Sequence, residues 1–316
     1  MKIINSSVDV LEQKPGIVGM FKHMEIIGRL SHKSEDRITE DSYIKFIDMM
    51  KRIGHWAVFN MGTVYLKFPI YNLRMIWKLL KHHPFARFKL RWFNIYATTD
   101  YRVILQEDLE EKMKKYWCDL TKHHHRKVTA HFICSRAISH ELVRHASLRP
   151  LQESTGYCNY GNSKFGSELT YILPQWIYKV RDSIGNTIDP LTGESREWIL
   201  GLDGQELWDT LCIYDRTVAS RDKRLKEAED EYLWEISTDE SYRLRPEDAR
   251  GGLPHDLKTE LYMCGFLKDW CMRPKTNERT GFFYLRSDQS AHPDVRVLSE
   301  ELEEIFRWKG YYDEIN

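Results

Sequence analysis

Apolar residues recur at helical spacing in the middle of the chain. Between Ile133 and His145, the side chains of Cys134, Ile138 and Leu142 follow one another four positions apart, and Ala137 lies beside them. This spacing predicts a helix with one buried face. The same spacing places polar residues near the end of the predicted helix, one turn apart on its surface.

A proline limits this predicted helix. Pro150 lacks an N–H group and disfavours the α conformation in the residue before it, so we expect the helix to end before it. The helix then delivers Glu141, Arg144 and His145 to its C-terminal end, and an irregular loop runs from Ser147 to Tyr160. The loop supplies polar side chains: Gln152, Glu153, Ser154, Thr155 and Asn159.

This combination of cationic and hydrogen-bonding groups suits an anionic ligand such as a nucleotide. A solvated helix end followed by a polar loop explains the same residues without a ligand. The residues alone leave these alternatives open.

Further elements follow from the same patterns. Before residue 130 we expect a strand at Lys2–Ile4, a helix capped by Thr39 and ended by Gly54, a mostly extended segment at Trp56–Phe68, a helix at Leu73–Leu80, a strand-like segment with a turn at Trp92–Val103 and a helix at Glu107–Trp117. After residue 200 we expect one or two surface helices in Gln205–Tyr232, a helix starting at Pro246, an extended segment at Glu260–Met263 and a final helix at Leu298–Trp308.

Charge and cysteine content narrow the class of protein. Lys plus Arg and Asp plus Glu both total 47 among 316 residues, and this neutral balance argues against a general nucleic-acid or membrane-surface role. The six cysteines form no C-x-x-C pair, which favours reduced thiols and a cytoplasmic location. We find neither a signal-peptide pattern nor an apolar run of about 18 residues. We assign no metal site to His123–His125, because adjacent residues point in different directions.

The polar group described above resembles a known family signature. Arg144-His145-Ala146, then seven residues, then Ser154, are similar to the Arg-His-Arg-(seven)-Ser signature of the flavin-dependent thymidylate synthases. The preceding sequence SRAISHELVRH, the run Gln-Glu-Ser-Thr-x-Tyr and an apolar stretch ending in Pro174 agree with the family as well.

Three further blocks resemble family elements in the same order. Gly54-His55 matches a Gly-His pair, and Arg250 matches the arginine of an Ala-Arg-x-x-Leu-Pro element that reaches the nucleotide. Leu285-Arg286, four residues and Ala291 match the closing element, in which Arg286 corresponds to the catalytic arginine.

The resemblance implies an enzyme that methylates dUMP to dTMP. Methylenetetrahydrofolate would donate the carbon, FAD would carry the hydride and NADPH would supply it. The implied fold is α/β, with a central sheet flanked by helices, in a homotetramer. It implies one domain over residues 1–316, with insertions at about 70–125, 176–245 and 273–281. We expect no nucleic-acid or membrane partner.

The resemblance also assigns roles to individual residues. The expected catalytic residues are Arg286 and Ser154. The expected substrate-binding residues are Glu141, Arg144, Gln152, Glu153, Ser154, Thr155, Gly156, Arg250 and Arg286. The expected cofactor-binding residues are His55, Ala57, Arg144, His145, Ala146, Gln152 and Lys268. Ser154 has no base partner at motif spacing, so we interpret it as a ligand donor rather than a nucleophile.

Several positions depart from the family pattern. Ala146 and Gly156 stand where the family has arginine, and Glu141 stands where it has glutamine. Elsewhere, Asn60-Met61 replaces Glu-His, Phe266 replaces an asparagine and Lys268 replaces an arginine. Each charge-assisted contact contributes about 1.5–3 kcal/mol, so two losses without replacement would weaken binding by roughly two orders of magnitude or more.

Compensation within the same region is one hypothesis. Arg149 and Lys268 would supply cations from nearby positions, and restoring arginine at Ala146 would then change flavin affinity little. Two further alternatives stay open: an enzyme of the same scaffold that modifies another pyrimidine nucleotide or forms a hydroxymethyl product, and a non-catalytic nucleotide-binding homologue.

Overall fold

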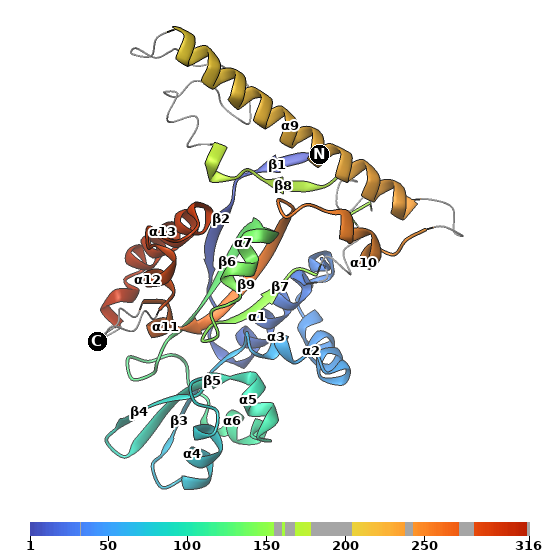
Figure 1. The fold of residues 1–316 in the computed structure, drawn as a ribbon. Coiled ribbons are helices and arrows are strands. Elements are labelled where there is room, and N and C mark those ends of the chain that lie inside the picture. Colours follow the sequence, from blue (N-terminus) through green and yellow to red (C-terminus); the bar gives the residue numbers. More distant parts are fainter. Residues whose placement is uncertain are drawn as a thin grey trace. The chain divides into compact units, whose positions relative to one another are not determined.

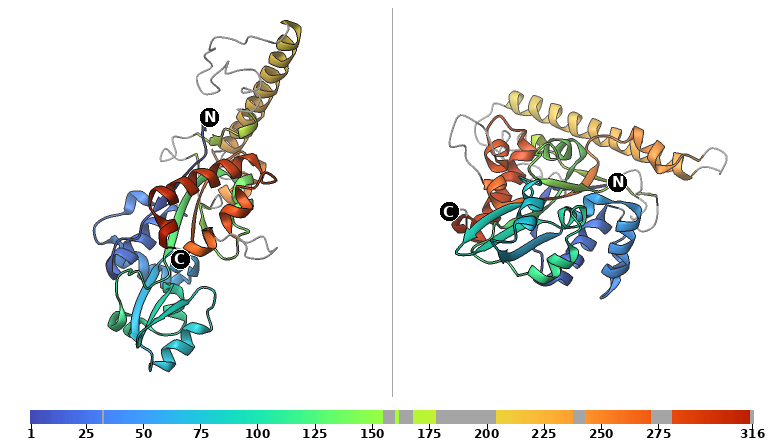
Figure 2. Two further views of the ribbon diagram at one scale, coloured as in Figure 1. Left: turned by 90° about the vertical axis from the view of Figure 1, so that its left-hand side faces the viewer. Right: turned by 90° about the horizontal axis from the view of Figure 1, so that it is seen from below.

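The computed structural model describes residues 1–31, 33–154, 160–161, 168–177, 204–237, 243–271 and 281–314. The chain divides into two compact units. Figures 1 and 2 show its helices and strands, coloured along the sequence. Unit 1 comprises residues 1–7, 133–140 and 154–259, and unit 2 comprises residues 8–132, 141–153 and 260–316. The expectation of one domain with three insertions stays a prediction.

A four-stranded sheet carries the motif region. Its strands lie in the order β2 (Ser7–Leu11), β6 (Lys127–Ser135), β9 (Lys258–Phe266) and β7 (Arg149–Gln152). The strand β7 lies at the edge and pairs antiparallel with β9. This edge position explains how a strand accommodates Pro150, because an edge strand has one side without ladder hydrogen bonds.

Helices pack on both sides of this sheet in unit 2 (Figure 1). The helices α1 (Gly16–Leu30), α2 (Ser42–Ile53) and α3 (Trp56–Phe59) share a buried cluster with Leu151 of β7 and Cys264 of β9. The helices α11 (Leu267–Cys271), α12 (Phe282–Arg286) and α13 (Pro293–Trp308) share an aromatic cluster. Phe132 of β6 contacts Phe282 of that cluster.

A second sheet of unit 2 contains three antiparallel strands in the order β3 (Thr63–Pro69), β5 (Asn94–Asp100) and β4 (Arg87–Arg91). The connecting helix α4 (Leu73–Leu80) follows β3, and α5 (Tyr101–Gln106) and α6 (Glu110–Tyr116) follow β5. Buried residues of this sheet, including Leu66, Phe68 and Ala97, belong to the same core as α1.

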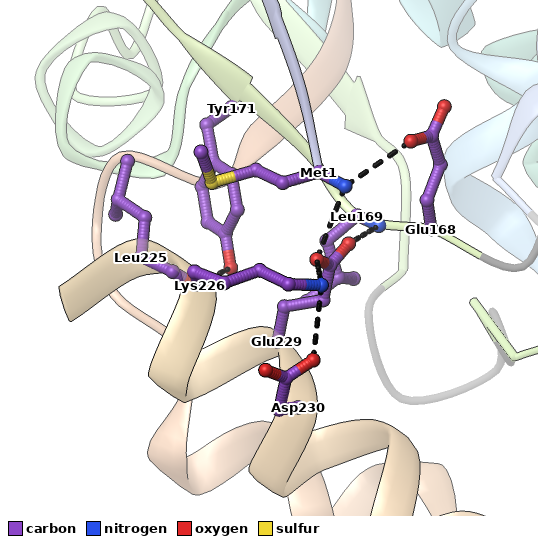
Figure 3. Close-up of polar contacts among 8 residues, drawn as sticks. All are labelled: Met1, Glu168, Leu169, Tyr171, Leu225, Lys226, Glu229 and Asp230. Atoms are coloured by element: carbon purple, nitrogen blue, oxygen red, sulfur yellow. Dashed lines mark hydrogen bonds and ion pairs between the residues drawn. The ribbon is translucent and has the colours of Figure 1, made fainter. Parts of the chain in front are cut away.

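Unit 1 is built around a long helix and a short parallel strand pair. The strand β1 (Lys2–Ile4) pairs with β8 (Thr170–Ile172), and α9 (Gly204–Ser237) lies beside them (Figure 1). Figure 3 shows how Glu229 of α9 joins them, since its carboxylate accepts the Leu169 N–H at 2.7 Å and lies 3.1 Å from the Met1 amine. The buried Glu229 therefore fixes the helix to the strand pair through polar contacts.

Many predicted elements are confirmed. The strand at Lys2–Ile4 and the helix at Leu73–Leu80 have the predicted bounds. Gly54 ends α2 in the left-handed conformation, with φ of 72°, which glycine adopts without steric cost. Glu260–Met263 lies within β9, the helix α10 (Pro246–Ala249) starts at Pro246, and Gln205–Tyr232 lies within α9.

Other expectations are wrong in part. Ile133–Ser135 belongs to β6, and the helix α7 covers only Arg136–Leu142. The segment expected as a loop contains β7, and the extended segment Trp56–Phe68 begins with α3. Each of these segments is short, and its apolar pattern fits either type of element until tertiary packing selects one.

The remaining differences concern element ends. The residue before α2 is Asp41 rather than Thr39, while Ser42 accepts the Thr39 N–H. The segment Trp92–Val103 contains β5 and most of the first turn of α5, the helix expected at Glu107–Trp117 covers Glu110–Tyr116, and the last helix begins at Pro293. No helix in the described part of the chain combines the length and the apolar character that a bilayer crossing requires.

Candidate functional site

Two motif blocks distant in sequence meet at one guanidinium. Arg286, at the end of α12, donates from Nε to Nε2 of His145 at 2.7 Å. Its Nη1 donates to Oε2 of Glu141 at 3.0 Å, and its Nη2 donates to the backbone oxygen of Glu141 at 2.7 Å. The structure thus brings together three of the predicted site residues, and the three contacts fix the plane of the guanidinium.

Local folding explains this convergence. The helix α7 ends at Leu142, and the chain then turns, so that Glu141 and His145 lie on successive turns of backbone. The ring of His145 contacts Phe282, which is buried at the start of α12 and anchors that helix in the aromatic cluster. Packing of the apolar Phe282 therefore places the polar Arg286 beside α7.

The imidazole of His145 is neutral near pH 7. Burial and the neighbouring Arg286 cation lower its pKa to about 4. Because Nε2 accepts a hydrogen bond from Arg286, the proton of the neutral ring lies on Nδ1. His145 therefore acts as an acceptor that orients Arg286.

Arg286 stays charged in this setting. Burial and the nearby Arg144 lower its pKa, while Glu141 raises it, and arginine remains protonated at any physiological pH. The side chain of Arg286 is 17% exposed and that of Glu141 is 30% exposed. This ion pair is therefore only partly shielded from solvent, and a ligand can compete for it.

Arg144 provides a second cation next to Arg286. Its side chain is exposed, and no hydrogen bond or ion pair joins it to another described residue. Ala146, two residues on, is exposed as well and contributes no charge. An exposed guanidinium beside a half-buried one suits a ligand that carries a phosphate group.

The motif residues of β7 contribute to a separate buried ion cluster. Gln152 is paired with Leu261 in the ladder, and Glu153 donates its N–H to the backbone oxygen of Glu260 at 2.8 Å. The carboxylates of Glu153 and Glu260 lie 3.6 Å and 2.5 Å from Nζ of Lys33. Desolvation opposes the charge on Lys33, but these carboxylates outweigh it and raise its pKa to about 12. Glu153 therefore has a structural partner inside the unit.

A histidine completes this ion cluster. His131 of β6 lies 2.9 Å from the second carboxylate oxygen of Glu260 and stacks on Tyr262 at 4.3 Å between ring centroids. Sequence reasoning missed Lys33, His131 and Glu260. The one available signal is that His131 and Glu260 are polar residues within largely apolar strands. Side chains alternate between the two faces of a strand, so such residues on neighbouring strands can share a sheet face.

The other expected cofactor residues lie elsewhere in unit 2. His55 precedes α3, and Ala57 packs against the core. Lys268 on α11 lies close enough to His125 to contribute to lowering the pKa of that ring. Among the described residues, no hydrogen bond or ion pair joins Lys268 to Arg144 or His145.

The compensating role suggested for Arg149 is not supported by its position. Its guanidinium lies 3.2 Å from the ring centroid of Phe85, and its Nε lies 3.6 Å from the buried carboxylate of Asp100. Lys127 pairs with the same carboxylate. Arg149 is thus committed to a buried ion cluster in unit 2.

Four expected substrate-binding residues, at positions 154, 155, 156 and 250, belong to unit 1. Ser154 is half-buried, and Arg250 is exposed in a short 3₁₀ helix, Arg250–Gly252. Thr155 and Gly156 lie outside the described residues. In the described part of the chain, no three His, Cys, Asp or Glu side chains gather as a metal ion would require.

Comparison with known proteins identifies the class. Residues 93–309 match the family model described as thymidylate synthase complementing protein. The chain belongs to this family, and the matched range contains all of the predicted site residues except His55 and Ala57. The α/β fold predicted from the resemblance is confirmed.

The chain also shows a limited likeness to solved structures. A UMP/dUMP methylase PolB from Streptomyces cacaoi bound with 5-Br dUMP shares 12% identity with a TM-score of 0.39, covering 98% of this chain and 93% of that one. The same protein bound with 5-Br UMP shares 12% identity with a TM-score of 0.39, covering 97% and 91%. A likeness of this size supports no conclusion about chemistry. No curated protein matches the chain.

Proposed function

We propose that this protein is a flavin-dependent thymidylate synthase that reductively methylates dUMP to dTMP. The observation that carries the proposal is the junction of Arg286, Glu141 and His145, which joins two blocks of the family pattern in a chain of that family. The substrates would be dUMP, methylenetetrahydrofolate and NADPH, with FAD as the cofactor.

Arg286 has the properties that activation of a uracil ring requires. Carbon 5 of uracil becomes nucleophilic when the ring gains negative charge, and a fixed cation at the N3/O4 edge stabilises that charge. The planar guanidinium contacts two acceptors in one plane, which a lysine cannot do. His145 holds this plane through Nε, and Glu141 accepts one N–H from each terminal nitrogen.

Glu141 therefore competes with the substrate for Arg286. Its carboxylate accepts from Nη1 as the oxygen of an anionic ring would. An anionic uracil ring at Arg286 would share this cation with the Glu141 carboxylate, and opening of the ion pair would favour its binding. A glutamine at this position, which the family has, would not compete as an anion.

The residues of the chain fit a flavin cofactor in this region. Arg144 offers an exposed guanidinium for an anionic diphosphate, and His145 offers a neutral aromatic ring. FAD would supply the hydride chemistry, and the protein would orient the reactants. Arg144, His145 and Gln152 are the residues proposed to hold it, together with His55 and Lys268.

A product analysis tests the proposal. The purified protein is incubated with dUMP, methylenetetrahydrofolate, NADPH and FAD, and the mass of the nucleotide product is measured. A dTMP mass is expected. Bound flavin with unchanged dUMP would contradict the substrate assignment, and a protein that binds no flavin would contradict the proposed chemistry.

One observation favours a second candidate function. Glu141 places a negative charge beside Arg286, where the family has a neutral glutamine, so the group proposed to face the nucleotide is different. An enzyme of the same scaffold that acts on another pyrimidine nucleotide, or that forms a hydroxymethyl product, would use the same junction. A hydroxymethylated nucleotide in the assay above would support this alternative.

A further inference from the structure

A group of large apolar side chains is exposed at one end of the three-stranded sheet. Pro69 of β3 pairs with Asn94 of β5, and Asn94 pairs with Arg91 of β4, so these strand ends lie together. The Ile70 N–H donates to the Phe93 oxygen at 2.9 Å, which closes this end. The exposed apolar side chains here and on the adjoining α4 are Ile70, Tyr71, Leu73, Trp77, Leu80, Leu90, Trp92 and Phe93, and we call them the 70–93 surface.

The helix α4 exposes an apolar stripe that its own fold does not use. Leu73, Trp77 and Leu80 lie at positions i, i+4 and i+7, which places them on one face. The face that packs into the core is a different one and carries Met75 and Leu79, both fully buried. The helix therefore has one apolar face for the core and a second apolar face toward solvent.

The turn between β4 and β5 contains a tryptophan at a position where the backbone conformation favours glycine or asparagine. Trp92 and Phe93 form a two-residue turn, and Trp92 adopts φ of 55°. Glycine or asparagine is preferred at such positions, and a bulky residue there is strained. The side chain of Trp92 is 83% exposed, so burial in the core does not offset the cost of this strained backbone conformation. A role outside the fold would explain the tryptophan.

The same segment is strongly basic. Between Ile70 and Phe93 the sequence has six Lys or Arg residues and no Asp or Glu: Arg74, Lys78, Lys81, Arg87, Lys89 and Arg91. Arg87 pairs with Asp269, but Arg74, Lys89 and Arg91 form no ion pair with another described residue. The pKa of His123 is lowered by burial and by the positive charges of Lys122, Arg91 and Lys89. This shift is expected where the local electrostatic potential is positive. The neutral total charge of the chain conceals this local excess.

We propose that the 70–93 surface binds the face of an anionic lipid bilayer. Its tryptophans and aliphatic side chains suit the boundary between headgroups and acyl chains, and its lysines and arginines suit anionic headgroups. Single-stranded nucleic acid stacks on aromatic rings and leaves Leu73, Leu80 and Leu90 without a role. A symmetric contact with a second copy would bring two surfaces of the same positive charge together.

A sedimentation experiment with vesicles tests the inference. The full-length protein is mixed with vesicles of phosphatidylglycerol and phosphatidylcholine in equal parts, with phosphatidylcholine vesicles, and with single-stranded DNA. Binding to the anionic vesicles is expected, with weaker binding to phosphatidylcholine and a decrease as salt is added.

A double variant separates binding from folding. Trp92→Gly with Phe93→Asn gives the turn residues that its backbone prefers, so stability to urea is expected to stay equal or to rise. Binding to anionic vesicles is expected to fall by about tenfold or more, because two aromatic side chains leave the surface. The matched control is Trp308→Ala, since Trp308 is 84% exposed on α13 and should leave binding unchanged.

Three results would each overturn the inference. The first is wild-type protein that stays in solution with anionic vesicles. The second is binding to single-stranded DNA without binding to vesicles. The third is a smaller oligomer on gel filtration of the double variant, with vesicle binding unaltered, which would assign the surface to a second copy.

Discussion

The carboxylate of Glu141 lies 3.0 Å from Nη1 of Arg286, although 145 positions separate the two residues along the chain. The pair joins the end of α7 to the end of α12, and His145 accepts from the same guanidinium. The proposed catalytic Arg286 is thus held by the anionic Glu141 and by the neutral ring of His145. Of the two, only Glu141 competes with an anionic nucleotide for the positive charge.

Removing the negative charge of Glu141 is expected to strengthen dUMP binding. Glu141→Gln retains the hydrogen-bonding shape but no longer competes as an anion for Arg286. A partly exposed ion pair contributes up to about 1 kcal/mol, so the affinity for dUMP should rise by roughly two- to fivefold. Calorimetric titration with dUMP measures this change. The control is Glu303→Gln, which removes another carboxylate paired with an arginine, and weaker dUMP binding by Glu141→Gln would refute the competition.

The fork geometry of Arg286 is expected to matter more than its charge. Arg286→Lys keeps the cation but cannot hold His145 and Glu141 in one plane. We expect the rate of dTMP formation to fall by about 10²-fold or more, with little change in circular dichroism. A lysine variant as active as the wild type would leave the proposed role of the guanidinium without support.

Arginine at position 146 is expected to strengthen flavin binding. The structure commits Arg149 to Phe85 and Asp100, so it does not replace the missing family arginine. Ala146→Arg at this exposed position should tighten FAD binding by about ten- to a hundredfold, the equivalent of one charge-assisted contact. Flavin fluorescence titration measures the affinity. An unchanged affinity would show that another cation compensates.

The ion cluster of Lys33 is expected to be important for stability. Lys33→Met leaves Glu153 and Glu260 close together and partly buried without their cation. Breaking a buried pair in this way costs about 3–5 kcal/mol in the free energy of unfolding. Urea denaturation measures it. Lys114→Met removes an exposed ion pair with Glu111 and should change stability by about 0.5 kcal/mol at most.

Acid is expected to destabilise the protein through its buried histidines. Burial, with Lys127 nearby, lowers the pKa of His23 to about 4, and the pKa of His145 is lowered to the same value. An unfolded histidine titrates near 6.5, so between these values the unfolded chain binds more protons than the folded one. The free energy of unfolding should therefore fall as the pH decreases from about 6.5 toward 4, by on the order of 1–3 kcal/mol per histidine.

Urea titrations at neutral and acidic pH test this dependence. His23→Leu removes a titrating ring that contacts the Thr129 hydroxyl at 3.3 Å and lies far from the motif in sequence. This variant should show a shallower loss of stability with acid than the wild type. Equal slopes for both proteins would exclude His23 as a contributor.

The sequence predicted several elements of the fold correctly and missed others near the site. The apolar spacing of Ile138 and Leu142 predicted α7, and the family resemblance gave both Arg286 and His145 as site residues, which the structure joins by a hydrogen bond. The strand β7 was missed because Pro150 is a strong signal for irregular structure, and only its edge position removes the conflict. The partner of Glu153 was also missed, since Lys33 is far away in sequence and follows a helix without any motif.

The division of the chain into two units has a consequence for its synthesis. Unit 1 consists of residues 1–7, 133–140 and 154–259. Unit 2 consists of residues 8–132, 141–153 and 260–316. Neither unit is formed by a single uninterrupted stretch of the chain. A nascent chain on the ribosome therefore holds the first strands of unit 2 without β9, α12 and α13 until its last stretch, which starts at Glu260, is made. Arg286 belongs to that stretch, so it can meet Glu141 and His145 only after the stretch has been synthesised.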